Sequence, residues 1–398
     1  MIIKPKFRGP ICIMSHPEGC EQNVLDQINY AKEHKIDNGP KKVLVIGSST
    51  GYGLASRIIS TFSAGAETIG VFYERPAVKN RTASAGWYNT VAFDKAAKES
   101  GYYSRSINGD AFSEELKRET IELIKKDWGK VDLIIYSLAA PRRIHPITGE
   151  TYSSVIKPIG KPFVGKTIDF HDHKVTDVVL EPASELEIAQ TVAVMGGEDW
   201  EMWIDALKEA DVLAEKATTV AYSYIGPEVT HAIYRSGTIG RAKDHLEDTA
   251  IKISERISHI GGRAFVSVNK AVVTQASLAI PAVPLYISIL YKVMKEKELH
   301  EDCIEQIYRL YKDWLYADKL ILDNQGRIRV DDWEMREDVQ EEVLQLWNEV
   351  NSDNVNELSD IDGFAKDFFK LFGFGIDSIN YNQEINQEVE IPNIINKI

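Results

Sequence analysis

Residues 41–55 read Lys41-Lys42-Val43-Leu44-Val45-Ile46-Gly47-Ser48-Ser49-Thr50-Gly51-Tyr52-Gly53-Leu54-Ala55. The apolar run at 43–46 predicts a strand that is buried on both faces. Gly47, Gly51 and Gly53 then permit a tight turn and let backbone N–H groups approach a phosphate. The helix that follows presents its positive N-terminus to the same place. Together these features predict a dinucleotide-binding unit.

A second apolar run at 69–73 ends at Tyr73 and Glu74. An acidic residue about twenty residues past the glycine turn accepts hydrogen bonds from the adenosine ribose and repels a 2′-phosphate. Glu74 therefore favours NADH, although the neighbouring Arg75 does not exclude NADPH. The alternative is a plain strand–turn–helix with glycines that serve packing. The spacing here, Gly-x3-Gly-x-Gly, differs from the commoner Gly-x-Gly-x-x-Gly.

Composition narrows the class of protein. The chain has 398 residues, 44% hydrophobic residues and a formal net charge of −14 at pH 7. The hydrophobic content is ordinary for a soluble globular protein, and the acidic balance argues against nucleic-acid binding, which requires a basic face. Cys12, Cys20 and Cys303 are too few for a disulfide framework and lack paired metal-ligand spacing. We expect a cytoplasmic protein with no nucleic-acid partner.

Two further segments bear on membrane and metal binding. Residues 276–291 carry no charge, but the run is short for a membrane span and contains Pro281 and Pro284. We expect a buried helix or pocket wall there and no membrane span. His171-Asp172-His173 could ligate a metal, yet two histidines in a polar loop are usually solvated, so no metal site is expected.

The apolar runs continue in alternation with amphipathic segments. Further strands are expected at 101–107, 131–136, 218–224 and 263–268, and helices at 112–127, 184–194, 199–214 and 240–257. Alternating strands and helices with short connections predict an α/β fold with a doubly wound parallel sheet.

Three additions to this sheet are expected. They are an N-terminal cap at 1–40 with one helix near 20–34, a β-rich insertion at 142–182, and a mainly helical C-terminal extension at 299–398. The extension should hold helices at 299–316, 336–350 and 361–371 and a loose tail from Asn380. We expect residues 1–398 to form a single large domain.

The insertion at 142–182 is rich in basic residues within an acidic protein. Two interpretations remain open: a solvated hairpin face, or contact with the phosphates of a large anionic substrate. The basic residues are Arg142, Arg143, Lys157, Lys161, Lys166 and Lys174.

Three tyrosine–lysine pairs could supply a proton donor beside a nicotinamide. A nearby ammonium holds the ribose hydroxyls and lowers the pKa of a tyrosine phenol. Tyr291/Lys295 and Tyr308/Lys312 have one-turn spacing but follow the sixth expected strand. Ligands bind beyond the carboxyl ends of parallel strands, so the active-site helix should follow the fifth. Tyr234 and Lys243 meet that condition.

The spacing of Tyr234 and Lys243 has a structural consequence. Nine residues at about 100° each would place them on opposite sides of one continuous helix. They converge only if the intervening segment, with Gly237 and Gly240, is partly non-helical. We therefore expect Tyr234 on a loop and Lys243 in the first turns of the next helix.

These motifs together resemble the trans-2-enoyl-CoA reductase/FabV-type enoyl reductase family over essentially the whole chain, most closely its clostridial members. The resemblance rests on the turn at 47–53, the Tyr-x8-Lys pair, Tyr-Ser-Leu-Ala-Ala-Pro-Arg-Arg at 136–143, Met-Gly-Gly-Glu-Asp-Trp at 195–200, Ala-Val-Val-Thr-Gln-Ala-Ser at 271–277 and the N-terminal Met-Ile-Ile-Lys-Pro. It implies a Rossmann fold of the short-chain dehydrogenase type, enlarged by insertions.

The resemblance also implies site roles. Tyr234 is the proton donor, Lys243 binds the cofactor ribose and Tyr224 contacts the substrate thioester; Tyr224 could otherwise be a plain strand aromatic, and Asp110 a turn residue. The implied cofactor-binding residues are Gly47, Ser48, Ser49, Thr50, Gly51 and Tyr52 at the pyrophosphate, Tyr73 and Glu74 at the ribose, Asp110 and Ala111 at the adenine, and Leu138, Ala139, Val272, Val273 and Thr274 at the nicotinamide.

The implied reaction is NADH-dependent reduction of the C2–C3 double bond of a short-chain trans-2-enoyl-CoA, such as crotonyl-CoA to butanoyl-CoA, in fatty-acid or butyrate metabolism. Two alternatives stay open: an enoyl-[acyl-carrier-protein] reductase, and a non-catalytic NAD(H)-binding protein. The expected partner is the enoyl-CoA thioester alone, and a monomer is expected rather than an oligomer.

Overall fold

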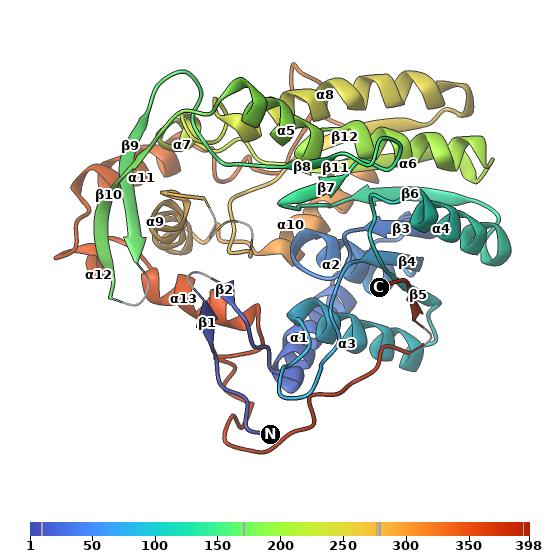
Figure 1. Ribbon diagram of the computed structural model, residues 1–398, viewed down its shortest axis with the longest axis horizontal. Helices are drawn as coiled ribbons and strands as arrows, with labels where there is room; N and C mark the ends of the chain where they lie inside the picture. The colour runs from blue at the N-terminus through green and yellow to red at the C-terminus, as the bar shows by residue number, and fades with distance from the viewer. Residues whose placement is uncertain (9–10, 170–171, 276, 278–279, 393) are drawn as a thin grey trace.

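The computed structural model describes residues 1–8, 11–169, 172–275, 277, 280–392 and 394–398. Its centre is an eight-stranded sheet in which every pair of neighbouring strands is parallel (Figure 1). In sheet order the strands are β13 (Ile328–Arg329), β12 (Arg263–Val268), β11 (Leu213–Ser223), β6 (Val131–Tyr136), β3 (Lys42–Ile46), β4 (Glu67–Phe72), β5 (Ser104–Asn108) and β14 (Ile395–Asn396). The six expected strands are confirmed.

Helices cover both faces of this sheet, as the doubly wound prediction requires (Figure 1). On β3, Val43 and Val45 pack into one core, whereas Leu44 and Ile46 pack into the core on the opposite face. The core that contains Val43 and Val45 includes α1 (Pro17–Glu33), α2 (Gly51–Ile58) with its π-helical continuation η1 (Ile59–Ser63), α3 (Ala85–Glu99) and α10 (Cys303–Arg309). The core on the opposite face includes α4 (Glu114–Asp127), α6 (Glu198–Glu209) and α8 (Thr238–Ile257). The short η2 (Ser258–Ile260) extends α8.

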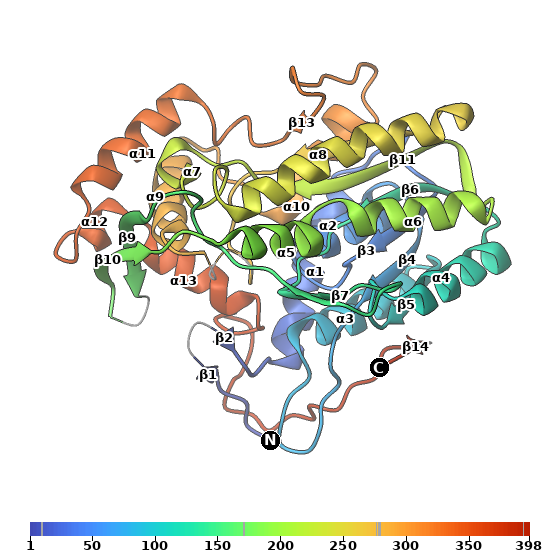
Figure 2. The same ribbon diagram turned by 45° about the horizontal axis from the view of Figure 1, so that its top comes forward.

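The insertion forms two antiparallel hairpins, which confirms its β-rich character. They are β7 (Arg142–Ile144) with β8 (Thr151–Ser153), and β9 (Phe163–Asp169) with β10 (Lys174–Leu180); α5 (Glu185–Met195) follows. The β9–β10 hairpin lies at the end of the molecule that carries α11 (Glu337–Glu349) and α12 (Val355–Leu358), in both views (Figures 1 and 2). His171 lies outside the described residues.

Three of the basic residues of the insertion have structural roles. Arg143 is 1% exposed and pairs with Glu198 on α6. Lys157 pairs with Glu187 at 2.6 Å, and Lys166 donates to backbone carbonyls at the end of α11. Because these cations are already occupied, the basic patch is smaller than the sequence suggests.

A long buried helix follows the sheet. The uncharged run at 276–291 continues into α9 (Val283–Glu296), which begins with Pro284 in its first turn, where proline is well tolerated. Its side chains form much of a third core together with α11 and α13 (Ile361–Lys370). Residues 276, 278 and 279 lie outside the described residues. Within the described part of the chain, no helix combines the length and apolar character needed to cross a bilayer.

One expected helix boundary was wrong. The helix expected at 199–214 ends at Glu209, because Asp211 adopts a left-handed conformation (φ 55°) and β11 begins at Leu213. The extension at 299–398 has helices where they were expected, namely α10 with the π-helical η4 (Leu310–Leu315), α11 and α13, together with the short α12; it also supplies the edge strands β13 and β14, which were not expected.

The tail was expected to be loose from Asn380, and this was also wrong for its described part. The carbonyls of Gln387 and Val389 accept hydrogen bonds from Tyr88 Oη and Trp87 Nε1 on α3, each at 2.7 Å. The tail then reaches β14, which pairs with β5 (Figure 2). The polar sequence of the tail did not predict these contacts, because backbone groups make most of them. The N-terminal cap packs nearby through β1 (Phe7–Arg8), β2 (Ile11–Cys12) and α1.

Candidate active site

The glycine turn after β3 is held by close backbone contacts. Gly47 has φ +88°, and a Cβ there would lie 2.3 Å from the carbonyl oxygen of Ser137. A Cβ at Gly53 would lie 1.8 Å from the carbonyl oxygen of Gly47. Thr50 precedes α2 and makes no side-chain cap, so the first N–H groups of the helix are open to an anion. This cradle fits a pyrophosphate.

Glu74 follows β4 and lies beside that turn. Its Oε1 accepts a hydrogen bond from Ser49 Oγ at 2.7 Å. The side chain of Asn108 on β5 bonds to both backbone groups of Glu74, at 2.8 and 2.9 Å, which fixes its position. Burial raises the pKa of Glu74, and hydrogen bonds from Ser84 and Ser49 oppose the shift. Tyr73, 63% exposed, opens onto the same edge.

The other predicted cofactor residues lie at the carboxyl ends of neighbouring strands. Asp110 and Ala111 follow β5, and Leu138 and Ala139 follow β6. Asp110 Oδ1 accepts from the Phe112 N–H at 3.0 Å, which makes it a turn-stabilising residue before α4. This contact and an adenine contact are compatible, because the second carboxylate oxygen remains.

Tyr52 links the glycine turn to the segment after β12. Its hydroxyl donates to the carbonyl oxygen of Lys270 at 2.7 Å, so the side chain points away from the phosphate cradle. Val272 and Val273 are buried just beyond, and Thr274 is partly buried. The phosphate turn and the predicted nicotinamide segment are therefore mechanically connected, and a phosphate contact at Tyr52 would have to come from its backbone.

Tyr224 and Tyr234 come together at the carboxyl end of β11. Tyr224 follows the strand, and Tyr234 lies in the turn between α7 (Glu228–His231) and α8. Their rings are 5.0 Å apart between centroids and meet edge to face at 71°. Tyr234 is 8% exposed, and burial raises its pKa. The expected loop position of Tyr234 is confirmed.

Lys243 lies in the second turn of α8, as expected. Its Nζ donates to the backbone carbonyl of Tyr222 on β11 at 3.1 Å, which directs the ammonium toward the same strand end. Burial lowers the pKa of Lys243 to about 8, and the negative charge of Glu247 opposes the shift. The charge on this group therefore changes within an accessible pH range.

The other two tyrosine–lysine pairs do not join this group. Tyr291 is fully buried on α9 against the ring of His300, and Lys295 pairs with Asp360 at 2.5 Å. Tyr308 packs against Tyr30 and His34 beside α1. The positional argument for Tyr234 and Lys243 is thus supported by geometry.

Sequence reasoning missed two residues of this region. Glu334 is fully buried, and its Oε1 lies within hydrogen-bond distance of the hydroxyl oxygens of Tyr224 and Tyr286. Tyr286 belongs to the buried helix α9, and Glu334 precedes α11. Tyr286 belongs to the run at 276–291 that was expected to form a buried helix or pocket wall, but no local signal placed its hydroxyl beside Tyr224, and none marked Glu334.

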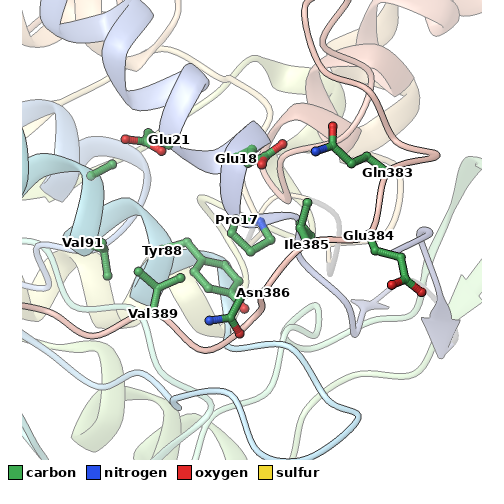
Figure 3. Close-up of a pocket in the computed structure, with 11 residues that line it drawn as sticks. Pro17, Glu18, Glu21, Tyr88, Val91, Gln383, Glu384, Ile385, Asn386 and Val389 are labelled. Atoms are coloured by element: carbon green, nitrogen blue, oxygen red, sulfur yellow. The ribbon is translucent and has the colours of Figure 1, made fainter. Parts of the chain in front are cut away.

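Two other features lie apart from the predicted residues. A cavity of about 380 Å³ lies between α1, α3 and the tail; Pro17, Tyr88 and Ile385 are in its wall, with Glu18 and Glu21 around it (Figure 3). A possible metal-ligand set, His300, Asp302 and Asp367, has donor atoms within 4.8 Å of one another. Asp302 already caps α10. Neither feature contains a predicted site residue.

Three family models match successive parts of the chain. Residues 2–79 match the NAD(P)H binding domain of trans-2-enoyl-CoA reductase, residues 81–316 match the trans-2-enoyl-CoA reductase catalytic region, and residues 322–385 match a model described as an enoyl reductase FAD binding domain.

The residues of this last segment do not fit a flavin site. Val339, Val343, Ile361 and Phe364 of the segment are buried in the core that surrounds α9. Within the described residues 322–385 there is no buried strand followed by a glycine turn and a helix like that at Gly47.

Named relatives cover nearly the whole chain. A trans-2-enoyl-CoA reductase [NADH] of Ruminiclostridium cellulolyticum is 61% identical over 394 residues, 99% of this chain and 100% of that protein. An enoyl-[acyl-carrier-protein] reductase [NADH] of Cytophaga hutchinsonii is also 61% identical, over 396 residues with the same coverage. The crystal structure of Treponema denticola trans-2-enoyl-CoA reductase with NAD has a TM-score of 0.94 at 50% identity and covers 97% of this chain and 98% of that one. The chain belongs to the trans-2-enoyl-CoA reductase family.

Proposed function

We propose that this chain reduces the C2–C3 double bond of short-chain trans-2-enoyl-CoA thioesters with NADH, for example crotonyl-CoA to butanoyl-CoA. The observation that carries the proposal is the convergence of Tyr224 and Tyr234, 5.0 Å apart, beyond the strand ends that carry the phosphate cradle. Lys243 is directed to the same strand end through its bond to Tyr222. Two phenols and an ammonium beside a dinucleotide cradle suit stabilisation of an oxyanion.

Bound NADH supplies a hydride to C3 of the acyl chain. As C3 gains the hydride, negative charge moves to the thioester oxygen and an enolate forms. The hydroxyls of Tyr224 and Tyr234 stabilise that oxygen, and one preorganised donor of this kind contributes about 3–4 kcal/mol. A proton drawn from solvent, directly or through a protein hydroxyl, then adds to C2, and the thioester carbonyl is restored. Lys243 holds the ribose hydroxyls, and Glu74 holds the adenosine ribose.

The group that carries the acyl chain, CoA or acyl carrier protein, needs a separate argument, because some relatives are named enoyl-CoA reductases and others enoyl-[acyl-carrier-protein] reductases. A free CoA thioester requires only a local basic patch, whereas a carrier protein is itself acidic and would meet a chain of net charge −14. This favours CoA. Steady-state kinetics with crotonyl-CoA and with crotonyl carrier protein, each with NADH and NADPH, test the proposal. If kcat/KM is higher for crotonyl carrier protein than for crotonyl-CoA, the chain is an enoyl-[acyl-carrier-protein] reductase instead. If the protein binds NADH but turns over neither substrate, it is a non-catalytic NAD(H)-binding protein.

We also infer that residues 1–398 act as one domain, as a monomer and in the cytoplasm. One core joins Ile3, Tyr286 and Phe364, which supports a single folding unit. The sheet ends on the two-residue strands β13 and β14, which offer little edge for pairing with another chain. Cys12 and Cys20 are free and buried, as suits a reducing compartment. Light scattering tests the monomer.

Cofactor choice should depend on Glu74. We expect Glu74→Ser to raise the preference for NADPH over NADH at least tenfold, about 1.4 kcal/mol, because the carboxylate that repels a 2′-phosphate is gone. The ratio of kcat/KM for the two cofactors measures this. Arg75→Ser is the matched control and should shift the ratio the other way or not at all. An unchanged ratio in Glu74→Ser would remove Glu74 from the ribose site.

Cofactor binding should weaken as the Lys243 ammonium is lost. Since burial lowers the pKa of this group to about 8, the charge is present below that pH and disappears above it. We expect KM for NADH to rise between pH 7 and about 9.5 in the wild type. Lys243→Met should show a high KM that no longer varies with pH, and Lys243→Arg should keep the charge throughout. A flat wild-type profile would contradict a role for this charge.

Catalysis should require the Tyr234 hydroxyl. Tyr234→Phe removes one hydroxyl and little volume, so we expect the fold to survive and kcat to fall by about 10²-fold or more. Tyr291→Phe and Tyr308→Phe, from the pairs outside the site, should stay near wild type. Kinetics with crotonyl-CoA measure all three. An inactive Tyr291→Phe beside a normal Tyr234→Phe would overturn the active-site assignment.

The insertion should contribute to CoA binding through its exposed cations. Arg142 and Lys161 are exposed, whereas Arg143, Lys157 and Lys166 have structural partners. We expect Arg142→Ala or Lys161→Ala to raise KM for crotonyl-CoA more than KM for a truncated crotonyl thioester without the nucleotide. Lys252→Ala, an exposed lysine on α8, is the control. Equal effects on both substrates would favour the solvated-hairpin interpretation.

A further inference from the structure

Glu334 is a buried carboxyl group that the chemistry above does not use. It lies between β13 and α11, in the C-terminal extension, and its side chain is 0% exposed. No side chain in the described part of the structure forms an ion pair with it. A buried carboxyl group without a paired cation is costly unless its oxygens are hydrogen-bonded.

Both oxygens of Glu334 are hydrogen-bonded at the substrate side of the site. Oε1 lies 2.6 Å from Tyr286 Oη and 3.0 Å from Tyr224 Oη. Oε2 accepts from the backbone N–H of Ala271 at 2.7 Å. Glu334 thus joins the substrate tyrosine, the buried helix α9 and the segment that leads to Val272.

The protonation state of Glu334 decides whether the hydroxyl hydrogen of Tyr224 is free to reach a substrate. An ionised carboxylate only accepts, so both phenols would donate to Oε1, and the single hydrogen of Tyr224 would be unavailable to a substrate. A carboxylic acid protonated on Oε1 can instead donate to Tyr224 Oη and accept from Tyr286. Its Oε2 still accepts from Ala271. Only in this state does the Tyr224 hydrogen remain free.

We propose that Glu334 is a positioning residue that acts as a neutral acid: it donates to Tyr224 Oη, holds that ring against Tyr234, and leaves the Tyr224 hydrogen directed at the substrate oxygen. The inference rests on the proposed function, because it requires Tyr224 to contact the thioester.

The surroundings of Glu334 are consistent with this state. Burial raises its pKa, and the Asp331 charge adds to the shift, while hydrogen bonds from Tyr286 and Ala271 and the charge of Lys270 oppose it. The Lys270 ammonium does not bond to Glu334 but to the carbonyl of Ala271, at 3.0 Å. Burial also lowers the pKa of Lys270, so the cation that could hold Glu334 ionised is itself disfavoured.

Two substitutions separate the neutral acid from the carboxylate. In Glu334→Gln the carbonyl oxygen can accept from Ala271 while the NH₂ group donates to Tyr224, which reproduces the donation proposed for the protonated acid but not its acceptance from Tyr286. We expect its kcat with crotonyl-CoA to stay within about threefold of wild type. Glu334→Met has similar volume and no donor, and we expect kcat to fall about tenfold or more, with KM for NADH within about twofold. Glu337→Gln, an exposed neighbour, is the control and should match wild type.

A double-mutant cycle with Tyr224→Phe tests whether Glu334 acts through that hydroxyl. We expect Glu334→Met to lower kcat in the wild-type background and to have little further effect in Tyr224→Phe. A purely structural role would give additive losses and would move the thermal midpoint in both backgrounds alike. Additivity would therefore overturn the proposal.

The remaining outcomes are also decisive. A loss of about tenfold or more in Glu334→Gln would show that a neutral donor to Tyr224 does not sustain activity, and would overturn the proposal even if Glu334→Met fails to fold. A Glu334→Met enzyme as active as wild type would overturn it as well. Absence of turnover by the wild type, or a fully active Tyr224→Phe, would instead remove the proposed function or the role of Tyr224, and the inference with it.

Discussion

The rest of the structure depends on one backbone contact at the end of β3. A side chain at Gly53 would collide with the carbonyl of Gly47, and one at Gly47 would collide with the carbonyl of Ser137 beyond β6. Because only hydrogen atoms intervene, α2 can begin directly against the sheet and present its free N–H groups at the strand ends. The order of strands reverses at β3, so this contact also lies at the crevice where parallel sheets bind ligands.

The insertion, α9 and the C-terminal extension, which are added to the sheet, contribute or position side chains near Tyr224. Helix α9 forms the centre of a core with α11 and α13, and it brings Tyr286 beside Tyr224. The C-terminal extension supplies Glu334, and the hairpin insertion docks on the end of α11 through Lys166. A cluster of buried polar side chains built from distant segments is consistent with a family whose sequence similarity extends over the entire chain rather than over the nucleotide-binding part alone.

Burial sets the electrostatic character of the site. The same loss of water lowers the pKa of Lys243 and raises those of Tyr224, Tyr234 and Glu334, because it disfavours the charged form of each group. Phenols that stay protonated in a low-dielectric site are effective donors to a developing oxyanion, since their dipoles are already oriented. Hydrogen bonds offset part of the cost of keeping these groups from water, since Tyr224 bonds to Glu334 and Lys243 bonds to the carbonyl of Tyr222.

The amino-acid sequence by itself determined the six longer strands of the central sheet, most helices, the glycine turn and the loop position of Tyr234, because local periodicity or glycine placement indicates each of them. It did not reveal the strand β14, the ordered tail, the burial of Arg143 or the contact of Glu334 with Tyr224. These depend on backbone groups or on residues far apart in the chain. Only the tertiary structure decided them, since a polar side chain carries no local sign of which distant partner will remove it from water.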